Sequence, residues 1–227
     1  MVKIKSQPVA IDYATGLQRY GILETRFLVY LCNYLNKHRS SLRDSEFFKF
    51  IQSEIILNID DLVSSLGLMQ KDGRRIFTKS HESFMKGIEN NEDGLWVAFS
   101  EYWNGNITIK VSQALIDQYK ENNPYLYNFD LSTIRGINSL SAIRFINYLY
   151  ANKFHTKHYS EIKLSLDDIR AIFGVEDSYT CLSNIRSKII GKSIEITNKH
   201  TKFNVYVKRK SSEIKDLNYY FVIETAI

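Results

Sequence analysis

Two fifteen-residue segments of the chain carry the same residue pattern, 107 positions apart. The first is EIILNIDDLVSSLGL at 54–68, and the second is EIKLSLDDIRAIFGV at 161–175. They share Glu, Ile, Leu, an Asp-Asp pair and a Gly at matching positions. Such an internal repeat predicts two similar substructures, so any interpretation of one segment has to serve for the other as well.

The repeat extends beyond these segments on both sides. Upstream of each lies an Arg-Phe-x-x-Tyr-Leu motif, at 26–31 and 144–149, among apolar residues that follow helical spacing. Downstream of each lies another helical stretch and then two runs of alternating apolar residues, which in the first copy flank Asn104-Gly105, a strong hairpin signal. An insertion at 40–52 in the first copy predicts a loop with a short helix. The other expected elements are helices at 24–39, 72–89, 142–157 and 179–197 and strands at 95–103, 106–111, 202–210 and 217–225.

The order of elements in each copy is helix, short strand, helix, helix and β-hairpin. This order is that of a winged helix-turn-helix. The sequence therefore predicts an α+β protein with two tandem winged helix-turn-helix domains related by the internal repeat, at residues 1–128 and 129–227.

The repeated Asp-Asp pair has two interpretations, a pair of catalytic or metal-binding carboxylates and the start of a helix. Asn58 and Ser165, which come just before each pair, are good N-cap residues, and acidic residues in the first turn suit the helix dipole. Gly67 and Gly174 follow each helix, where glycine most easily forms a left-handed C-cap. Adjacent carboxylates on a helix also point about 100° apart. We interpret the pairs as helix caps.

Composition narrows the class of protein. The 44% hydrophobic and 24% charged residues are ordinary for a soluble globular protein. The sequence has no apolar run of the roughly 20 residues that span a bilayer, and no apolar segment of a signal peptide follows Lys3 and Lys5. Cys32 and Cys181 are far apart and outside any metal-binding spacing, which is typical of free thiols in a reducing compartment. We expect a cytoplasmic protein without membrane contact.

The net charge of +5 is concentrated in the C-terminal part of the chain. Residues 1–135 carry 16 Lys and Arg against 16 Asp and Glu, whereas residues 136–227 carry 14 against 9. A local basic excess is expected where a protein meets phosphates, although a solvated lysine-rich surface gives the same count. Arg can pair with guanine, Asn with adenine, and Ser with phosphates or base edges. The candidate DNA-binding residues are Ser183, Asn184, Arg186, Ser187, Lys188, Lys192, Lys202, Lys208, Arg209 and Lys210 in the second copy, and Lys71, Arg74, Arg75 and Lys79, next to His81, in the first.

The ordered series of motifs resembles plasmid replication initiators of the Rep_3 type. The resemblance extends from about residue 20 to 224. It rests on the order of the motifs, because no single motif is diagnostic of the family. Its matching positions in the second copy are Ser141, Ile143-Arg144, Tyr148-Leu149, Asp167–Arg170, Phe173–Tyr179, Arg186, Lys188 and Glu195-Ile196.

The resemblance implies an origin-binding protein of bacterial plasmids. Its partners would be double-stranded DNA with direct repeats (iterons), host replication proteins such as a helicase or initiator, and a second copy in a monomer–dimer equilibrium. The dimer would bind an inverted repeat and repress the protein's own gene. The resemblance places a recognition helix at 179–190 and a basic wing at Lys208–Lys210, with 1–128 serving dimerisation and auxiliary DNA contacts and 129–227 most of the DNA binding. Gly191 departs from the pattern because it interrupts a helix that would ordinarily run on, and the aromatic hairpin at 95–111 is a candidate dimer surface.

Two other functions stay open. A transcriptional regulator could use the same winged helices at a promoter only. A nicking initiator would need two metal-binding histidines one residue apart, whereas His155 and His158 are separated by two residues. The sequence has no GxxxxGK[ST] phosphate loop and no GxSxG motif. We therefore expect a protein that is not an enzyme, with no catalytic residue, cofactor or metal.

Overall fold

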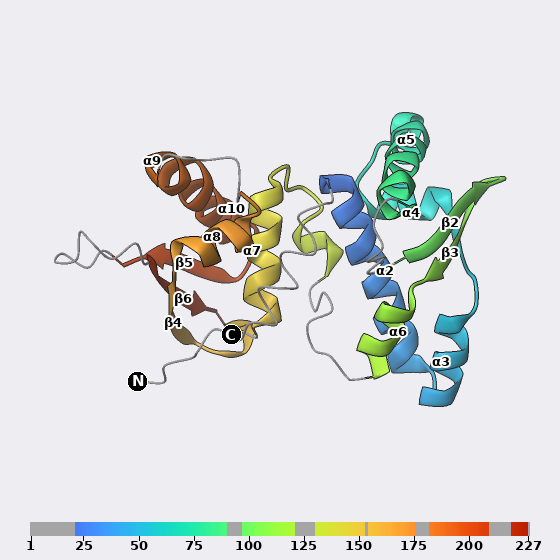
Figure 1. The fold of residues 1–227 in the computed structure, drawn as a ribbon, viewed down its shortest axis with the longest axis horizontal. Coiled ribbons are helices and arrows are strands. Elements are labelled where there is room, and N and C mark those ends of the chain that lie inside the picture. Colours follow the sequence, from blue (N-terminus) through green and yellow to red (C-terminus); the bar gives the residue numbers. More distant parts are fainter. Residues whose placement is uncertain are drawn as a thin grey trace. The chain divides into compact units, whose positions relative to one another are not determined.

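The structure, a computed structural model, describes residues 21–89, 97–120, 130–152, 154–175, 182–208 and 219–226. These residues divide into two compact units (Figure 1). We call residues 21–120 and 130–136 the N-terminal unit and residues 137–226 the C-terminal unit. Each combines helices with one three-stranded antiparallel sheet, so the mixed helix-and-strand class expected from the sequence is confirmed.

The N-terminal unit contains the expected helices and hairpin. Its sheet has the order β1-β3-β2, with the hairpin of β2 and β3 closed at Asn104-Gly105. Both turn residues have positive φ, 48° and 78°, as a two-residue hairpin turn that matches the strand twist requires. Its elements are α2 Ile22–Ser41, α3 Asp44–Gln52, β1 Ile55–Asn58, α4 Ile59–Ser65, α5 Gln70–Glu89, β2 Val97–Trp103, β3 Asn106–Val111, α6 Gln113–Lys120 and η2 Leu131–Thr133.

The core of the N-terminal unit is formed by alternate residues of its strands and by one side of its helices. Along β1 the side chains of Ile55 and Leu57 are buried and those of Ile56 and Asn58 are exposed, as the period of two in a strand dictates. Helix α2 buries a continuous stripe that includes Cys32. Burial raises the pKa of the Cys32 thiol, which identifies it as an inert core residue.

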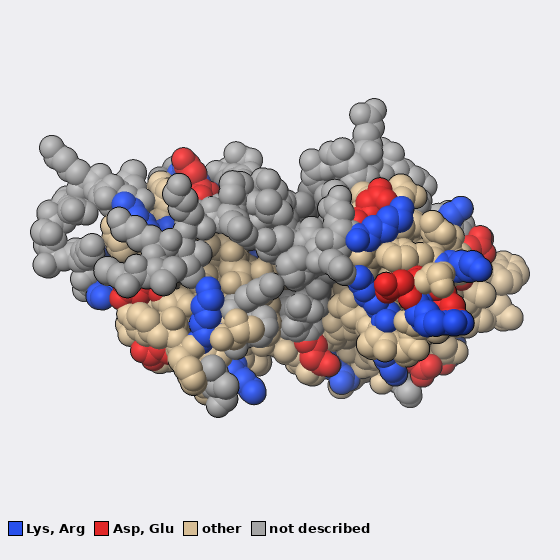
Figure 2. Space-filling view, turned by 90° about the horizontal axis from the view of Figure 1, so that it is seen from below, with Lys and Arg blue, Asp and Glu red and all other residues tan. Residues whose placement is uncertain are grey.

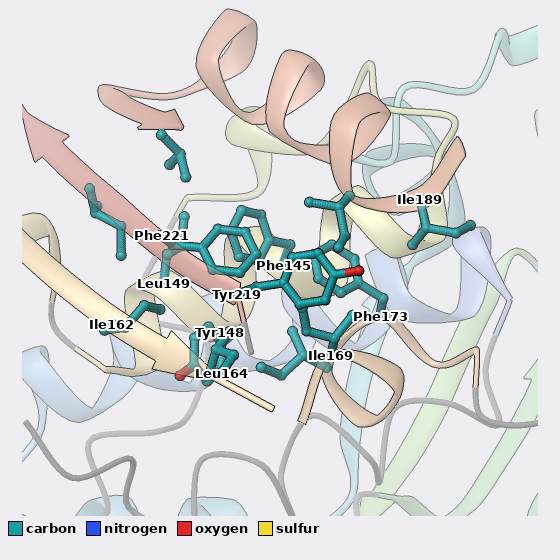
Figure 3. Close-up of a cluster of buried hydrophobic side chains, with 14 of the residues drawn as sticks. Phe145, Tyr148, Leu149, Ile162, Leu164, Ile169, Phe173, Ile189, Tyr219 and Phe221 are labelled. Carbon is teal, nitrogen blue, oxygen red and sulfur yellow. The ribbon is translucent and has the colours of Figure 1, made fainter. Parts of the chain in front are cut away.

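The C-terminal unit also has a helix, a strand, further helices and then two strands in this order, without counterparts of α6 and η2 after its last strand among the described residues. Its sheet has the order β4-β6-β5, in which the last strand in the sequence lies in the middle. The inward side chains of this sheet pack with those of α7, α8 and the helical segment 182–200 into one core that contains Phe145, Phe173 and Phe221 (Figure 3). Its elements are α7 Leu140–Ala151, η3 Phe154–Thr156, β4 Tyr159–Leu164, α8 Leu166–Phe173, α9 Leu182–Asn184, η4 Ile185–Gly191, α10 Lys192–His200, β5 Phe203–Val207 and β6 Tyr219–Thr225.

The Asp-Asp pairs start helices in both units, so the capping interpretation is confirmed. The Asn58 side chain accepts hydrogen bonds from the backbone N–H groups of Asp60 (2.9 Å) and Asp61 (3.3 Å). In the second copy the Ser165 hydroxyl accepts from the Asp168 N–H (3.1 Å), and the Asp168 carboxylate accepts from the Ser165 N–H (2.8 Å). This reciprocal pair is a capping box, which satisfies two N–H groups that the helix leaves unpaired.

Ser165→Ala is expected to destabilise the C-terminal unit by about 1 kcal/mol, because the Asp168 N–H loses its acceptor. Chemical denaturation of the protein measures the loss. Ser165→Asn is the matched control, since it transfers the cap of the first copy to the second and is expected to retain most of the stability. Equal stability of the Ala variant and the wild type would contradict the role of the cap.

The helix after Gly174 corrects the sequence interpretation. The helix expected at 179–197 is present from Leu182 to His200 in the described residues, but the interruption expected at Gly191 from the family pattern is wrong, because the Gly191 backbone is α-helical (φ −59°, ψ −48°). Residues 185–191 within it form a π-helix, a wider turn that is rare in proteins and frequent at functional sites. Gly191 is tolerated because buried side chains on both sides of it, Ile190 and Ser193, hold the helix on the core. Residues 179–181 of the expected recognition helix lie outside the described residues.

Candidate nucleic-acid interface

The helix 182–200 exposes most of the candidate residues that were selected within it. Its apolar side is held in the core by Ile185, Ile189 and Ile190. The intervening positions face solvent: Ser183, Arg186, Ser187, Lys188 and Lys192 are exposed, and Asn184 is half-buried. The structure thus brings six of the predicted contacts together on one helix.

Two of these side chains already have partners in the protein. The Ser187 hydroxyl donates to the Ser183 carbonyl (2.8 Å), which leaves its oxygen able to accept a further hydrogen bond. The guanidinium carbon of Arg186 lies over the ring of Tyr219, 5.7 Å from the ring centroid. Tyr219 comes from strand β6 and was not among the residues selected by type and spacing.

The lysines that follow this helix stand in different surroundings. Lys202 is exposed just before β5. The Lys208 ammonium donates to the Glu161 carboxylate of β4 (2.9 Å), and this hydrogen bond raises the pKa of Lys208. The same carboxylate accepts from the Tyr159 hydroxyl. Arg209 and Lys210, the other expected wing residues, lie outside the described residues.

The basic residues expected in the N-terminal unit are exposed on α5, but acidic partners neutralise two of them. The Arg74 guanidinium binds both carboxylate oxygens of Asp60, at 2.6 Å for the Nε–Oδ1 pair, and lowers the pKa of that carboxyl. Arg75 lies 3.4 Å from Asp72. On the face drawn in Figure 2, basic and acidic side chains alternate over this unit. Lys71 and Lys79 are also exposed.

His81 corrects the sequence interpretation, which placed it beside these contacts. Its side chain is buried against the Phe77 ring, with 6.0 Å between the ring centroids. Burial lowers its pKa and so favours the neutral ring. His81 therefore cannot reach a DNA backbone. The sequence did contain a signal for this burial: His81 follows Phe77 by four residues, so both fall on one face of the helix.

The described residues contain no group of three or more His, Cys, Asp or Glu side chains placed to hold a metal ion. His158 is exposed, and the side chain of His155 is outside the described set. Within the described ranges, no helix has both the length and the apolar character that crossing a bilayer requires.

The comparison with protein families bears directly on the exposed helix. Residues 165–218, which include α8, this helix and β5, match the family described as "Initiator Rep protein, WH2". This segment is therefore similar to the initiator Rep WH2 domain. The resemblance seen in the sequence is therefore confirmed over the part of the chain that carries most of the candidate contacts.

A solved structure agrees with this assignment at the level of the fold. The chain is similar to a protein in the "Crystal structure of Pi initiator protein in complex with iteron DNA", with a TM-score of 0.56 and 12% sequence identity. The similarity covers 77% of this chain and 82% of the other, so it extends into both units. The comparison with curated proteins finds no match.

Proposed function

We propose that this chain is a plasmid replication initiator that binds iteron repeats at the origin through its C-terminal unit. The observation that carries the proposal is the exposed polar face of helix 182–200, which lies inside the segment that matches the initiator Rep family. Winged-helix proteins place such a helix in the major groove, where Arg and Asn side chains can read base edges. The solved Pi initiator that shares this fold is bound to iteron DNA.

We include in this proposal the division of the chain into two winged helix-turn-helix domains. We assign a winged helix-turn-helix to each of residues 1–128 and 129–227, related by the internal repeat, with the C-terminal one supplying most of the DNA affinity. The support is the common order of elements and the sheets β1-β3-β2 and β4-β6-β5, in which the first and last strands of the unit pair. The unequal affinity is supported by the ion pairs that occupy Arg74 and Arg75 on α5.

Footprinting on the protein's own replicon tests this function. Protection of tandem direct repeats beside an A·T-rich stretch is expected for an initiator, and plasmid replication is expected to require the protein. Protection of one palindrome only, with replication unaffected, would instead favour the transcriptional regulator. An initiator that represses its own gene as a dimer would protect the repeats and a palindrome. Host helicase or initiator proteins are then the partners to seek in a bacterial cytoplasm.

Glu161→Gln is expected to strengthen DNA binding about two- to five-fold for every sequence, because it releases Lys208 to a phosphate and removes a negative charge. Lys208 stays protonated near neutral pH, since its pKa only returns toward the ordinary lysine value. The measurement is DNA affinity as a function of salt concentration. The slope of log affinity against log salt concentration is expected to be steeper by about one than that of the wild type.

Glu224→Gln is the matched control for this change. Glu224 lies on the same side of the sheet and accepts from Asn204 (2.9 Å) and Tyr206 (3.2 Å), neither of which is a cation. The control removes one negative charge without releasing a lysine. Equal gains from both substitutions would show that Lys208 does not reach DNA.

The N-terminal unit is proposed to carry the dimer contact on the outer face of its sheet. Ile56 and Trp103, exposed by 64% and 77%, share that face, because both are in register with the side of β3 that presents Thr108. Large exposed apolar side chains of this kind are typical of interaction surfaces. We therefore extend the candidate dimer surface of the hairpin to include β1.

Trp103→Asp is expected to weaken self-association by on the order of tenfold or more, as for an aromatic at the centre of an interface. Analytical ultracentrifugation of the full chain measures the effect. Met69→Asp is the control, since Met69 is 84% exposed in the same unit but precedes α5 and is not part of the sheet. An unchanged dimer in the Trp103 variant, or equal losses in both, would remove the sheet face from the dimer contact.

A further inference from the structure

We infer that Tyr219 is a positioning residue for base recognition, because its ring holds the Arg186 guanidinium at the DNA-facing side of helix 182–200. The inference rests on the proposed DNA-binding function and adds a residue of the sheet to it. Arg186 lies in the π-helical segment η4 and Tyr219 begins strand β6, and the two meet with 5.7 Å between the guanidinium carbon and the ring centroid.

The position of the Tyr219 ring is fixed by the surrounding core and sheet. Tyr219 is only 7% exposed and belongs to the core of the C-terminal unit, in the cluster with Phe145, Phe173 and Ile189 that Figure 3 draws. It also pairs with Leu164 of β4 in the sheet register. A side chain held by both the sheet and the core has little freedom to move, so whatever rests on its ring is held as well.

The Arg186 side chain starts from a position that is also fixed. Its neighbour Ile185 is fully buried, and Ile189 one turn later is buried too, so the backbone of η4 is anchored on both sides of the arginine. The Arg186 side chain itself is exposed. Only its rotatable bonds remain to be ordered, and the contact with Tyr219 restricts them.

This contact leaves the hydrogen-bonding groups of the guanidinium available. A cation–π interaction uses the face of the aromatic ring and the delocalised charge of the guanidinium, whereas a guanine is read by N–H donors in the guanidinium plane. Arg loses considerable rotamer entropy when it is ordered, and preorganisation before binding lowers that cost. Tyr219 can therefore favour a bidentate contact with a base without occupying its donors.

The experiment has to separate positioning from the structural role of a core aromatic. Tyr219→Leu removes the aromatic face, and Phe221→Leu is the matched control, because Phe221 lies on the same strand, faces the same core and makes no cation–π contact with Arg186 among the described residues. Tyr219→Phe keeps the ring. Each is combined with Arg186→Lys, and affinity is measured for the repeat found by footprinting and for random-sequence DNA.

We expect Tyr219→Leu to lower affinity for the repeat about 3- to 10-fold, with little change for random DNA and with loss of this effect in the Arg186→Lys background. Tyr219→Phe is expected to bind like the wild type, and Phe221→Leu to leave the discrimination between the two DNAs unchanged. Equal loss of discrimination in Tyr219→Leu and Phe221→Leu, or an effect that persists without Arg186, would overturn the inference.

A second measurement does not depend on DNA or on the folding of a variant. Nitrogen relaxation of the arginine Nε–H groups in the wild-type protein is expected to show Arg186 more ordered than Arg75, whose ion pair is exposed. Equal mobility of the two would contradict the contact itself. If the wild type fails to prefer any repeat over random DNA, the proposed function fails, and the relaxation result still decides whether Tyr219 holds Arg186.

Discussion

Gly174→Val is expected to lower the free energy of unfolding of the C-terminal unit by about 4 kcal/mol or more, which is a large part of the stability of a typical small domain. Gly174 ends α8 with a φ of +64°, in the left-handed region where a β-branched residue is strained by about 1–2 kcal/mol. The N–H groups of Gly174 and Val175 donate to the carbonyls of Ala171 (3.3 Å) and Arg170 (3.0 Å), and this closure depends on that conformation.

The space beside Gly174 is already filled by Arg144. A Cβ at this position would clash with the Arg144 Nη1 atom, which donates to the carbonyls of Phe173 (3.2 Å) and Gly174 (3.3 Å). Arg144 is buried, so displacing it leaves a cation and two carbonyls with poorer partners, at about 1–3 kcal/mol for each group. The Arg of the repeated Arg-Phe-x-x-Tyr-Leu motif thus closes the end of α8 in the second copy.

Thermal or chemical denaturation measures the effect, and Gly191→Ala provides the control. Gly191 is helical, and an added Cβ would come no closer than 3.4 Å to the Arg186 carbonyl, so alanine there is expected to be neutral or to stabilise by up to about 1 kcal/mol. A Gly174→Val protein as stable as the wild type would mean that α8 can end in another conformation.

The local signals of the sequence account for most of the fold. Ser165 and Asp168 cap a helix through neighbours three positions apart, and Asn104-Gly105 sets a hairpin within two residues. These interactions are decided inside a short segment, so the sequence displays them directly. Gly191 misled the interpretation because its intrinsic cost, about 1 kcal/mol, is smaller than the burial that its neighbours gain on the core.

The site was harder to predict than the fold because its interactions join distant positions. The residues of the helix face could be selected by type and spacing, and the structure places them on one surface. Their partners could not: Glu161 meets Lys208, Asp60 meets Arg74, and Tyr219 lies beneath Arg186 only after the chain has folded. Counting charges in the sequence therefore overestimates how many cations are available to DNA.

Arg186→Ala is expected to weaken binding to the protein's specific repeat by roughly 1–3 kcal/mol, about 5- to 150-fold, while binding to random DNA changes little. The reason is that the loss of a bidentate base contact affects only the sequence that offers the matching base. Substituted repeats identify that base, because the alanine variant is expected to lose discrimination at one position of the site and to keep it at the others.

Lys188→Ala and Lys192→Ala are the matched controls on the same exposed helix. Lysines that contact phosphates contribute equally to every sequence, so each control is expected to weaken specific and random binding alike and to reduce the salt slope by about one. If Arg186→Ala behaves as the lysine variants do, lowering the salt slope and leaving discrimination intact, then Arg186 contacts a phosphate. Ser183, Asn184 and Ser187 would then be the next candidates for recognition, because these polar groups of the same helix face can pair with base edges.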